Sequence, residues 1–305
     1  NEREILDRLR KRLPAKSGVV LGIGDDCAIY RPRRGEELLF TTDFLLENVH
    51  FRWDTHKAGE VGHKALARGL SDIAAMGGQP RFCLLSLALP ERANRRWVAA
   101  FYAGLLKLAA RTGTVLAGGD LAAADKVACD IAVCGAVPVG KALRRSGARP
   151  RDAIYVSGML GGSALGLATG KGAAWKRHIA IEPRLRLGEF IRKRLRATAA
   201  MDLSDGLSID LERLCRESAV SAAIGMPPAF PGASAAQVLD GGEDYELLFT
   251  VGPRTRVPEE FEGIPLTRIG EMIAGNAGRV LLNDKLLKPG GFDHFANRRD
   301  GCRDG

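Results

Sequence analysis

Short turns of Gly, Ser or Thr that carry an aspartate recur along most of this chain, and most of them directly follow an apolar run. A strand that ends in such a turn presents a hard carboxylate oxygen at the rim of a sheet, with little side chain to block an approaching phosphate. One such turn is ordinary loop chemistry, but the repetition predicts carboxylates gathered around several divalent cations and a polyphosphate. The turns are Gly24-Asp25-Asp26, Thr41-Thr42-Asp43, Leu70-Ser71-Asp72, Gly118-Gly119-Asp120, Asp202-Leu203-Ser204-Asp205-Gly206 and Gly241-Gly242-Glu243-Asp244.

Strand-like and helix-like segments alternate between these turns, which predicts a chain built from both helices and sheets. The stretch 138–150 is rich in Gly, Pro and Arg, and it predicts a boundary between two domains, residues 1–138 and 139–305. The segment 82–89 alternates too little for a half-exposed strand, so we expect it to be buried on both faces, and 226–237 is expected to be a loop. Helices are expected at 59–76, 94–111, 163–168, 182–196 and 207–218, and strands at 37–42, 82–89, 115–117, 126–137, 153–157, 245–251 and 266–270.

Composition narrows the class of protein. The 305 residues suit two ordinary domains, and no apolar run is long enough to span a bilayer. The six cysteines form no CxxC pair and no signal peptide is recognisable, so we expect a reduced, cytoplasmic protein without a membrane partner. The net charge of +9 comes from scattered arginines, and aromatic residues make up only 6%, which disfavours a nucleic-acid partner.

Each acidic turn also has a purely structural interpretation. Asp202 or Asp205 precedes a helix and is a candidate N-cap, and Asp120 is a candidate hairpin residue. Asp72 falls near the end of a predicted helix, where the helix dipole favours cations, so this position suggests another role. Neither the P-loop nor the dinucleotide-binding glycine pattern is present, and no protein-kinase signature with a catalytic base is found.

Taken together, the motifs resemble those of the thiamine-monophosphate kinase family, within the superfamily of aminoimidazole ribonucleotide synthetase and selenophosphate synthetase. The most specific strings are Gly24-Asp25-Asp26-Cys27-Ala28, Leu70-Ser71-Asp72 and Gly241-Gly242-Glu243-Asp244-Tyr245-Glu246. The match is collinear over nearly the whole chain, and it also includes residues 41–43, 48–51, 64–67, 118–120, 142–147, 202–207 and 291–295.

The resemblance implies an α+β protein with the two-domain fold of aminoimidazole ribonucleotide synthetase. Residues 1–138 would bind ATP and Mg²⁺ and pair with a second copy into a dimeric β-barrel, and residues 139–305 would form an α/β domain that completes the active-site cleft. The reaction implied is ATP-dependent phosphorylation of thiamine monophosphate to thiamine diphosphate, a step of thiamine diphosphate biosynthesis. The implied partners are ATP as co-substrate, thiamine monophosphate, several Mg²⁺ ions and a second copy of the chain.

The resemblance also implies site residues, carried over motif by motif. Mg²⁺ would be held by Asp26, Thr41, Thr42, Asp43, Asp72, Asp120, Asp202 and Asp205. ATP would contact Gly119, Asp120, Arg145 and Ser204, and thiamine monophosphate would contact His50, Glu243 and Phe292. No general base is implied. From the residues alone, a lone histidine beside apolar residues, such as His50, is usually structural, and a residue such as Arg145 is more often part of a solvated linker.

The chain departs from the family pattern in three places. Leu121-Ala122-Ala123-Ala124 stands where a hydroxyl residue tends to follow Asp120, the segment 221–239 is short, and the tail 298–305 extends beyond the last motif. These departures leave two points undecided, namely whether the chain makes a phosphate contact next to Asp120 and how the loop on the substrate side is built.

The acceptor phosphate has a second pKa near ~6 and is largely anionic at neutral pH, so it needs little help from a base. Metal ions and arginine are therefore expected to dominate a direct in-line transfer without a phosphoenzyme. Two alternatives stay open: an ATP-dependent synthetase of the same superfamily, which Cys27 fits poorly, and a non-catalytic Mg-nucleotide sensor.

Overall fold

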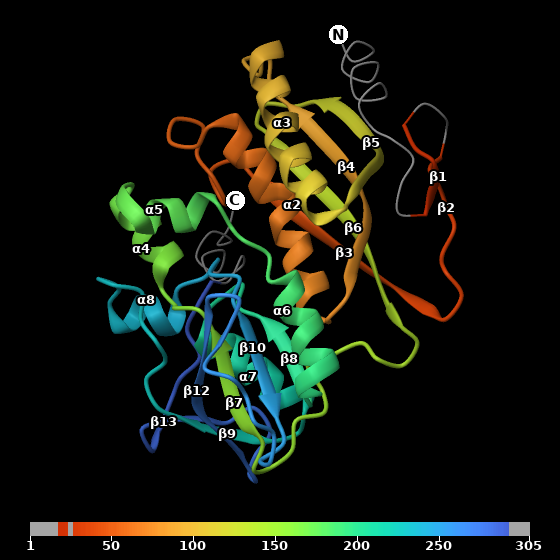
Figure 1. The fold of residues 1–305 in the computed structure, drawn as a ribbon. Helices are drawn as coiled ribbons and strands as arrows, with labels where there is room; N and C mark the ends of the chain where they lie inside the picture. Colours follow the sequence, from red (N-terminus) through yellow and green to blue (C-terminus); the bar gives the residue numbers. More distant parts are fainter. Residues whose placement is uncertain (1–17, 24–26, 293–305) are drawn as a thin grey trace, which may run out of the picture. The chain divides into compact units, whose positions relative to one another are not determined.

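The computed structural model describes residues 18–23 and 27–292, and it confirms a mixed α+β architecture (Figure 1). The chain forms two compact units. The first unit comprises residues 1–143 and 179–196, and the second comprises 144–178 and 197–305. No pattern in the sequence predicted that residues 179–196 belong to the first unit. In the described part of the chain, no helix is both long and apolar enough to cross a membrane.

The first unit is built on a four-stranded sheet of order β3-β6-β4-β5. Only β4 and β5 run parallel, and the other neighbours are antiparallel. A separate pair of short strands, β1 and β2, precedes it. The bounds are β1 Val19–Leu21, β2 Ile29–Tyr30, β3 Glu36–Leu46, β4 Gln79–Leu89, β5 Val115–Ala123 and β6 Ala128–Pro138.

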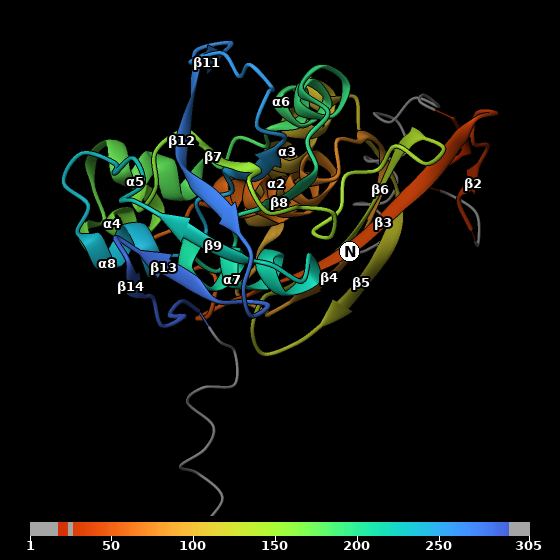
Figure 2. The same ribbon diagram turned by 90° about the horizontal axis from the view of Figure 1, so that it is seen from below.

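Helices α2 (Ala58–Ala75) and α3 (Arg95–Thr112) lie on one side of this sheet (Figure 2). Both helices were predicted, and their ends follow local chemistry: the Asn94 side chain accepts from two backbone N–H groups of α3, and Gly77 adopts φ 67° after α2. The two helices pack very closely, since a Cβ at Gly62 would lie 2.0 Å from the Phe101 carbonyl oxygen. Helix α6 (Leu185–Phe190) also packs against α2.

The other side of the sheet carries exposed apolar side chains. Phe40 and Phe44 of β3 are 70% and 59% exposed, and Leu84 of β4 is 37% exposed. The prediction that 82–89 is buried on both faces is therefore wrong, because helices cover one face of β4 only. We call this surface the open face. The register places Phe44, Asp130, Ser86 and Asp120 in one row across the four strands.

The second unit is built on a larger mixed sheet of order β14-β13-β9-β12-β7-β10-β8, with β11 beside β12. Its strands are β7 Ala153–Ser157, β8 Ala199–Asp202, β9 Ser221–Ile224, β10 Leu247–Val251, β11 Glu260–Phe261, β12 Ile264–Ile273, β13 Val280–Leu282 and β14 Lys285–Leu286. Its helices are α4 Gly162–Thr169, α5 Gly172–Ile179, α7 Leu207–Glu217 and α8 Ala235–Asp240. Leu207, Leu211 and Leu214 of α7 are fully buried in a core with residues of the sheet, as their helical spacing predicts.

The expected helix 182–196 is the least accurate prediction of an element. The segment folds as α6 and then as a short π-helix, Ile191–Leu195, which ends at Arg196 in a left-handed conformation with φ 52°. Helix α5 and strands β2, β8, β9, β11, β13 and β14 were not predicted. The expected loop 226–237 already contains the start of α8, capped by Ser234.

Candidate functional site

In the first unit, three of the predicted metal ligands meet between β3 and α2. Thr41 and Asp43 are two residues apart on β3 and therefore point to the same side, toward α2. The Thr41 hydroxyl donates to Asp72 Oδ2 over 2.5 Å. Asp72 lies in the last turn of α2, so this hydrogen bond links α2 to β3, and a ligand role for Asp72 remains a prediction.

Arg68 belongs to the same group, and it was missed from the sequence. It lies one helical turn before Asp72, its Nη2 is 2.6 Å from Asp43 Oδ1, and its Nη1 donates to the Phe44 carbonyl over 2.7 Å. The available signal in the sequence was the four-residue spacing of Arg68 and Asp72, which places both on one face of α2. The guanidinium neutralises Asp43 in this arrangement, so a cation that binds Asp43 through Oδ1 has to displace it.

The oxygen donors of Thr41, Asp43 and Asp72 are of the hard type that Mg²⁺ prefers, so the residues present fit that ion. Within residues 18–23 and 27–292, no group of three His, Cys, Asp or Glu side chains is close enough to hold a metal by itself. Asp26, which was predicted to contribute, lies outside the described residues.

Thr42 and Asp120 do not join this cluster within one copy of the first unit. Thr42 follows Thr41 on β3 and is exposed on the open face. Asp120 is in β5, at the opposite edge of the sheet, which places it about 14 Å from β3 if three strand spacings are counted. Asp120 is thus a mid-strand residue and not the hairpin residue that we considered. Gly119 beside it is closely packed, because a Cβ there would lie 1.9 Å from the Leu85 carbonyl oxygen.

His50 is buried in the turn that follows β3. Its Nδ1 accepts the Leu46 N–H over 3.0 Å, and its carbonyl accepts from the fully buried Lys64 ammonium over 3.0 Å. These contacts fix the turn, so the structural interpretation of His50 has direct support. A contact with substrate at this residue remains a prediction.

In the second unit, the turn 202–206 connects β8 to α7. The N-cap of α7 is Gly206, so neither Asp202 nor Asp205 has the capping role that we considered. Asp210, inside the helix, accepts the N–H groups of Asp205 and Gly206 and so holds the turn against α7, and burial raises the pKa of Asp210 to about 6. Asp205 forms an ion pair of 2.5 Å with Arg213.

The segment 243–246, which we call the strap, lies directly on this turn. The Glu243 N–H donates to the Ser204 carbonyl over 2.7 Å, and the Tyr245 N–H donates to the Leu203 carbonyl over 2.9 Å. From the end of the described chain, the Phe292 N–H donates to the Asp205 carbonyl over 3.1 Å. The second unit therefore brings together four residues that sequence reasoning assigned separately to metal, ATP and substrate.

Arg145 lies apart from this group on the surface of the second unit. Its carbonyl accepts from the Ser218 hydroxyl over 2.8 Å, and its side chain is exposed. An exposed guanidinium is suited to an anionic ligand, but this position gives no direct support for a nucleotide contact.

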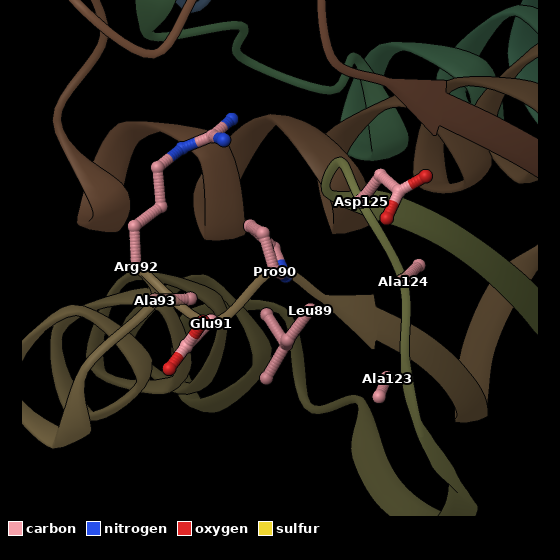
Figure 3. Close-up of a pocket in the computed structure, with 8 residues that line it drawn as sticks. All are labelled: Leu89, Pro90, Glu91, Arg92, Ala93, Ala123, Ala124 and Asp125. Atoms are coloured by element: carbon pink, nitrogen blue, oxygen red, sulfur yellow. The ribbon is translucent and has the colours of Figure 1, made fainter.

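An open surface groove of about 800 Å³ also lies in the first unit (Figure 3). Its lining residues come from the end of β4 and from the end of β5, and none of them is a predicted site residue. Ala123 and Ala124, part of the departure from the family pattern, form one wall, and Glu91 and Arg92 lie on the other. The groove is therefore distinct from the Thr41–Asp72 cluster.

Comparison with known proteins assigns the architecture. Residues 24–141 match the family model described as AIR synthase related protein, N-terminal domain. A thiamine-monophosphate kinase of Escherichia coli K12 is 37% identical, over 95% of this chain and 95% of that protein. The crystal structure of thiamine-monophosphate kinase from Stenotrophomonas maltophilia K279a has a TM-score of 0.84 at 35% identity, covering 92% of this chain and 96% of that one. The structure of AaThiL complexed with AMPPCP and TMP has a TM-score of 0.77 at 31% identity, covering 96% and 97%.

Proposed function

The chain belongs to the thiamine-monophosphate kinase family, and we propose that it transfers the γ-phosphate of ATP directly, in line, to thiamine monophosphate, giving ADP and thiamine diphosphate. The observation that supports this most strongly is similarity over nearly the full length to curated thiamine-monophosphate kinases, together with a related structure that holds an ATP analogue and TMP.

The residues suit a transfer that needs no general base. Both phosphates are anionic, so the barrier is mainly electrostatic. Bound Mg²⁺ ions would neutralise that charge. Thr41, Asp43 and Asp72 would hold such ions in the first unit, and Asp202 and Asp205 in the second, with Asp26, Thr42 and Asp120 completing the proposed set.

The remaining proposed contacts also come from both units. Gly119, Asp120, Arg145 and Ser204 are proposed for ATP, and His50, Glu243 and Phe292 for thiamine monophosphate. Residues 1–138 are proposed as the ATP- and Mg²⁺-binding and dimerisation domain, and residues 139–305 as the α/β domain that completes the active-site cleft. We also propose a cytoplasmic location, which the five free cysteines of the described chain support.

The direct test is ADP release with Mg-ATP in the presence of thiamine monophosphate, free thiamine or no acceptor, with the product identified by chromatography. We expect thiamine diphosphate from the monophosphate only. No turnover that depends on thiamine monophosphate, in a folded protein that still binds ATP, would favour the synthetase or the sensor. Recovery of a covalently phosphorylated protein during turnover would exclude direct transfer.

A homodimer through the open face is part of this proposal. Phe40 and Phe44 of β3 and Leu84 of β4 expose apolar side chains that a second copy would cover. We expect the double variant Phe40→Ser/Leu84→Ser to sediment as a monomer at concentrations where the unaltered protein is a dimer. Leu286→Ser removes a side chain that is 59% exposed in the second unit, and it should leave the dimer intact. A double variant that remains dimeric would place the interface elsewhere.

A further inference from the structure

Behind the strap of the second unit lies a buried polar pair that is not among the proposed site residues. Ser163 of α4 and His178 of α5 are each 1% exposed. His178 Nδ1 is 2.9 Å from Ser163 Oγ and 3.6 Å from Glu243 Oε2. A single ring nitrogen therefore faces both a buried hydroxyl and the carboxylate that we assign to the substrate.

The backbone of the strap is held in an unfavourable conformation at two residues. Glu243 and Tyr245 have φ values of 66° and 50°, in the left-handed region that residues other than glycine seldom adopt. Such conformations persist where surrounding contacts over-determine them, and they concentrate at functional sites. The hydrogen bonds to the carbonyls of Ser204 and Leu203 fix the strap on one side.

Helices α4 and α5 fix the strap on the other side. Between the two strained residues, the Asp244 carboxylate accepts the N–H groups of Gly161 and Ser163, over 2.5 and 3.1 Å. Arg177 donates to the Asp244 carbonyl over 2.7 Å and forms an ion pair with buried Glu246. Two successive residues of α5 thus contact the strap. The Arg177 guanidinium contacts the Asp244 carbonyl and the Glu246 carboxylate, and the His178 ring contacts the Glu243 carboxylate.

We propose that His178, oriented by Ser163, is a positioning residue that fixes the direction of the Glu243 carboxylate and thereby sets the affinity for thiamine monophosphate without affecting ATP. This inference rests on the proposed function, because Glu243 is assigned to the substrate there. Thiamine monophosphate carries a permanent cation in its thiazolium ring, which a fixed carboxylate attracts. A carboxylate that is ordered before binding saves the entropy of ordering it in the complex.

The variants separate positioning from folding. His178→Leu keeps a large buried side chain and removes the nitrogen, whereas His178→Asn offers an amide N–H near the place of Nδ1. Ser163→Ala removes the orienting hydroxyl. His56→Asn is the control. Like His178, His56 is a buried histidine, but it lies in the first unit, where its Nδ1 accepts a backbone N–H.

The measurement is calorimetric binding of thiamine monophosphate in the presence of Mg-AMPPCP, alongside binding of AMPPCP itself and steady-state kinetics. We expect His178→Leu to weaken thiamine monophosphate binding about tenfold and Ser163→Ala about threefold. Affinity for AMPPCP and kcat should stay within about twofold, and His178→Asn should recover most of the lost affinity. In a Glu243→Gln background, His178→Leu should have little further effect, because coupled residues are not additive.

Unchanged affinity for thiamine monophosphate in His178→Leu, or an equal loss for AMPPCP that His178→Asn does not relieve, would overturn the positioning role. If His178→Leu does not fold, Ser163→Ala becomes the deciding variant. Unchanged affinity for thiamine monophosphate in Ser163→Ala would likewise overturn the positioning role. Failure of the proposed function is distinguishable, because the unaltered protein would then neither bind thiamine monophosphate nor release ADP in response to it.

Discussion

Replacement of Asp72 by asparagine is expected to leave the protein folded and to lower the rate of thiamine diphosphate formation by about two to three orders of magnitude. The amide oxygen of asparagine can still accept the Thr41 hydroxyl, so the link between β3 and α2 is preserved. The carboxylate charge is lost, however, and with it one of the hard ligands proposed for Mg²⁺. Steady-state kinetics at several Mg²⁺ concentrations would measure the rate, and thermal unfolding would report on the fold.

Asp54→Asn is the matched control for this variant. It makes the same change of charge in the same unit, at an exposed position outside the proposed site, and its rate should stay within about twofold of normal. Turnover of Asp72→Asn near the normal rate would mean that Asp72 only stabilises the contact between β3 and α2. Mg²⁺ binding followed by calorimetry without nucleotide gives a second, non-catalytic comparison of the two variants.

Replacement of Gly119 by alanine is expected to lower the free energy of unfolding by about 3 kcal/mol and to abolish nucleotide binding. The added Cβ would lie 1.9 Å from the Leu85 carbonyl oxygen, on the neighbouring strand of the sheet. That atom is backbone, so β5 has to shift away from β4, and Asp120 shifts with it. Urea unfolding and AMPPCP titration would measure the two effects.

Gly113→Ala controls for the loss of a glycine. Gly113 ends α3 with φ 72°, and a Cβ there would meet nothing within 4 Å, so we expect a cost of about 1 kcal/mol from backbone conformation alone. Equal unfolding midpoints for the two variants would contradict the steric explanation for Gly119. Normal AMPPCP affinity in Gly119→Ala would contradict the assignment of Gly119 and Asp120 to ATP.

Features governed by nearby residues were predictable from the sequence. Asn94 marked the start of α3, Gly77 marked the end of α2, and 153–157 forms a strand within the predicted bounds. The acidic turns were also recognisable, because a carboxylate beside Gly, Ser or Thr is a local pattern, and their collinear order pointed to the family.

Other features depend on which segments meet in three dimensions. The open face of β4, the return of 179–196 to the first unit, and the separation of Asp120 from Asp43 follow from the strand order and from which face the helices cover. His178 could not be singled out from the sequence, since its partner Glu243 lies 65 positions further along the chain. The contact also depends on the left-handed backbone conformation of Glu243 and Tyr245, which the sequence does not reveal.

The family, the alternation of helices and strands, and the residue types available to bind phosphate and metal could therefore be read from local patterns in the chain, because these are short-range properties. The three-dimensional fold was needed to show which carboxylates share a location, which are neutralised by Arg68 or Arg213, and which buried groups hold them in place. Hydrogen bonds and close ion pairs form only between groups within about 4 Å of each other, so their partners are set by packing and not by position in the sequence.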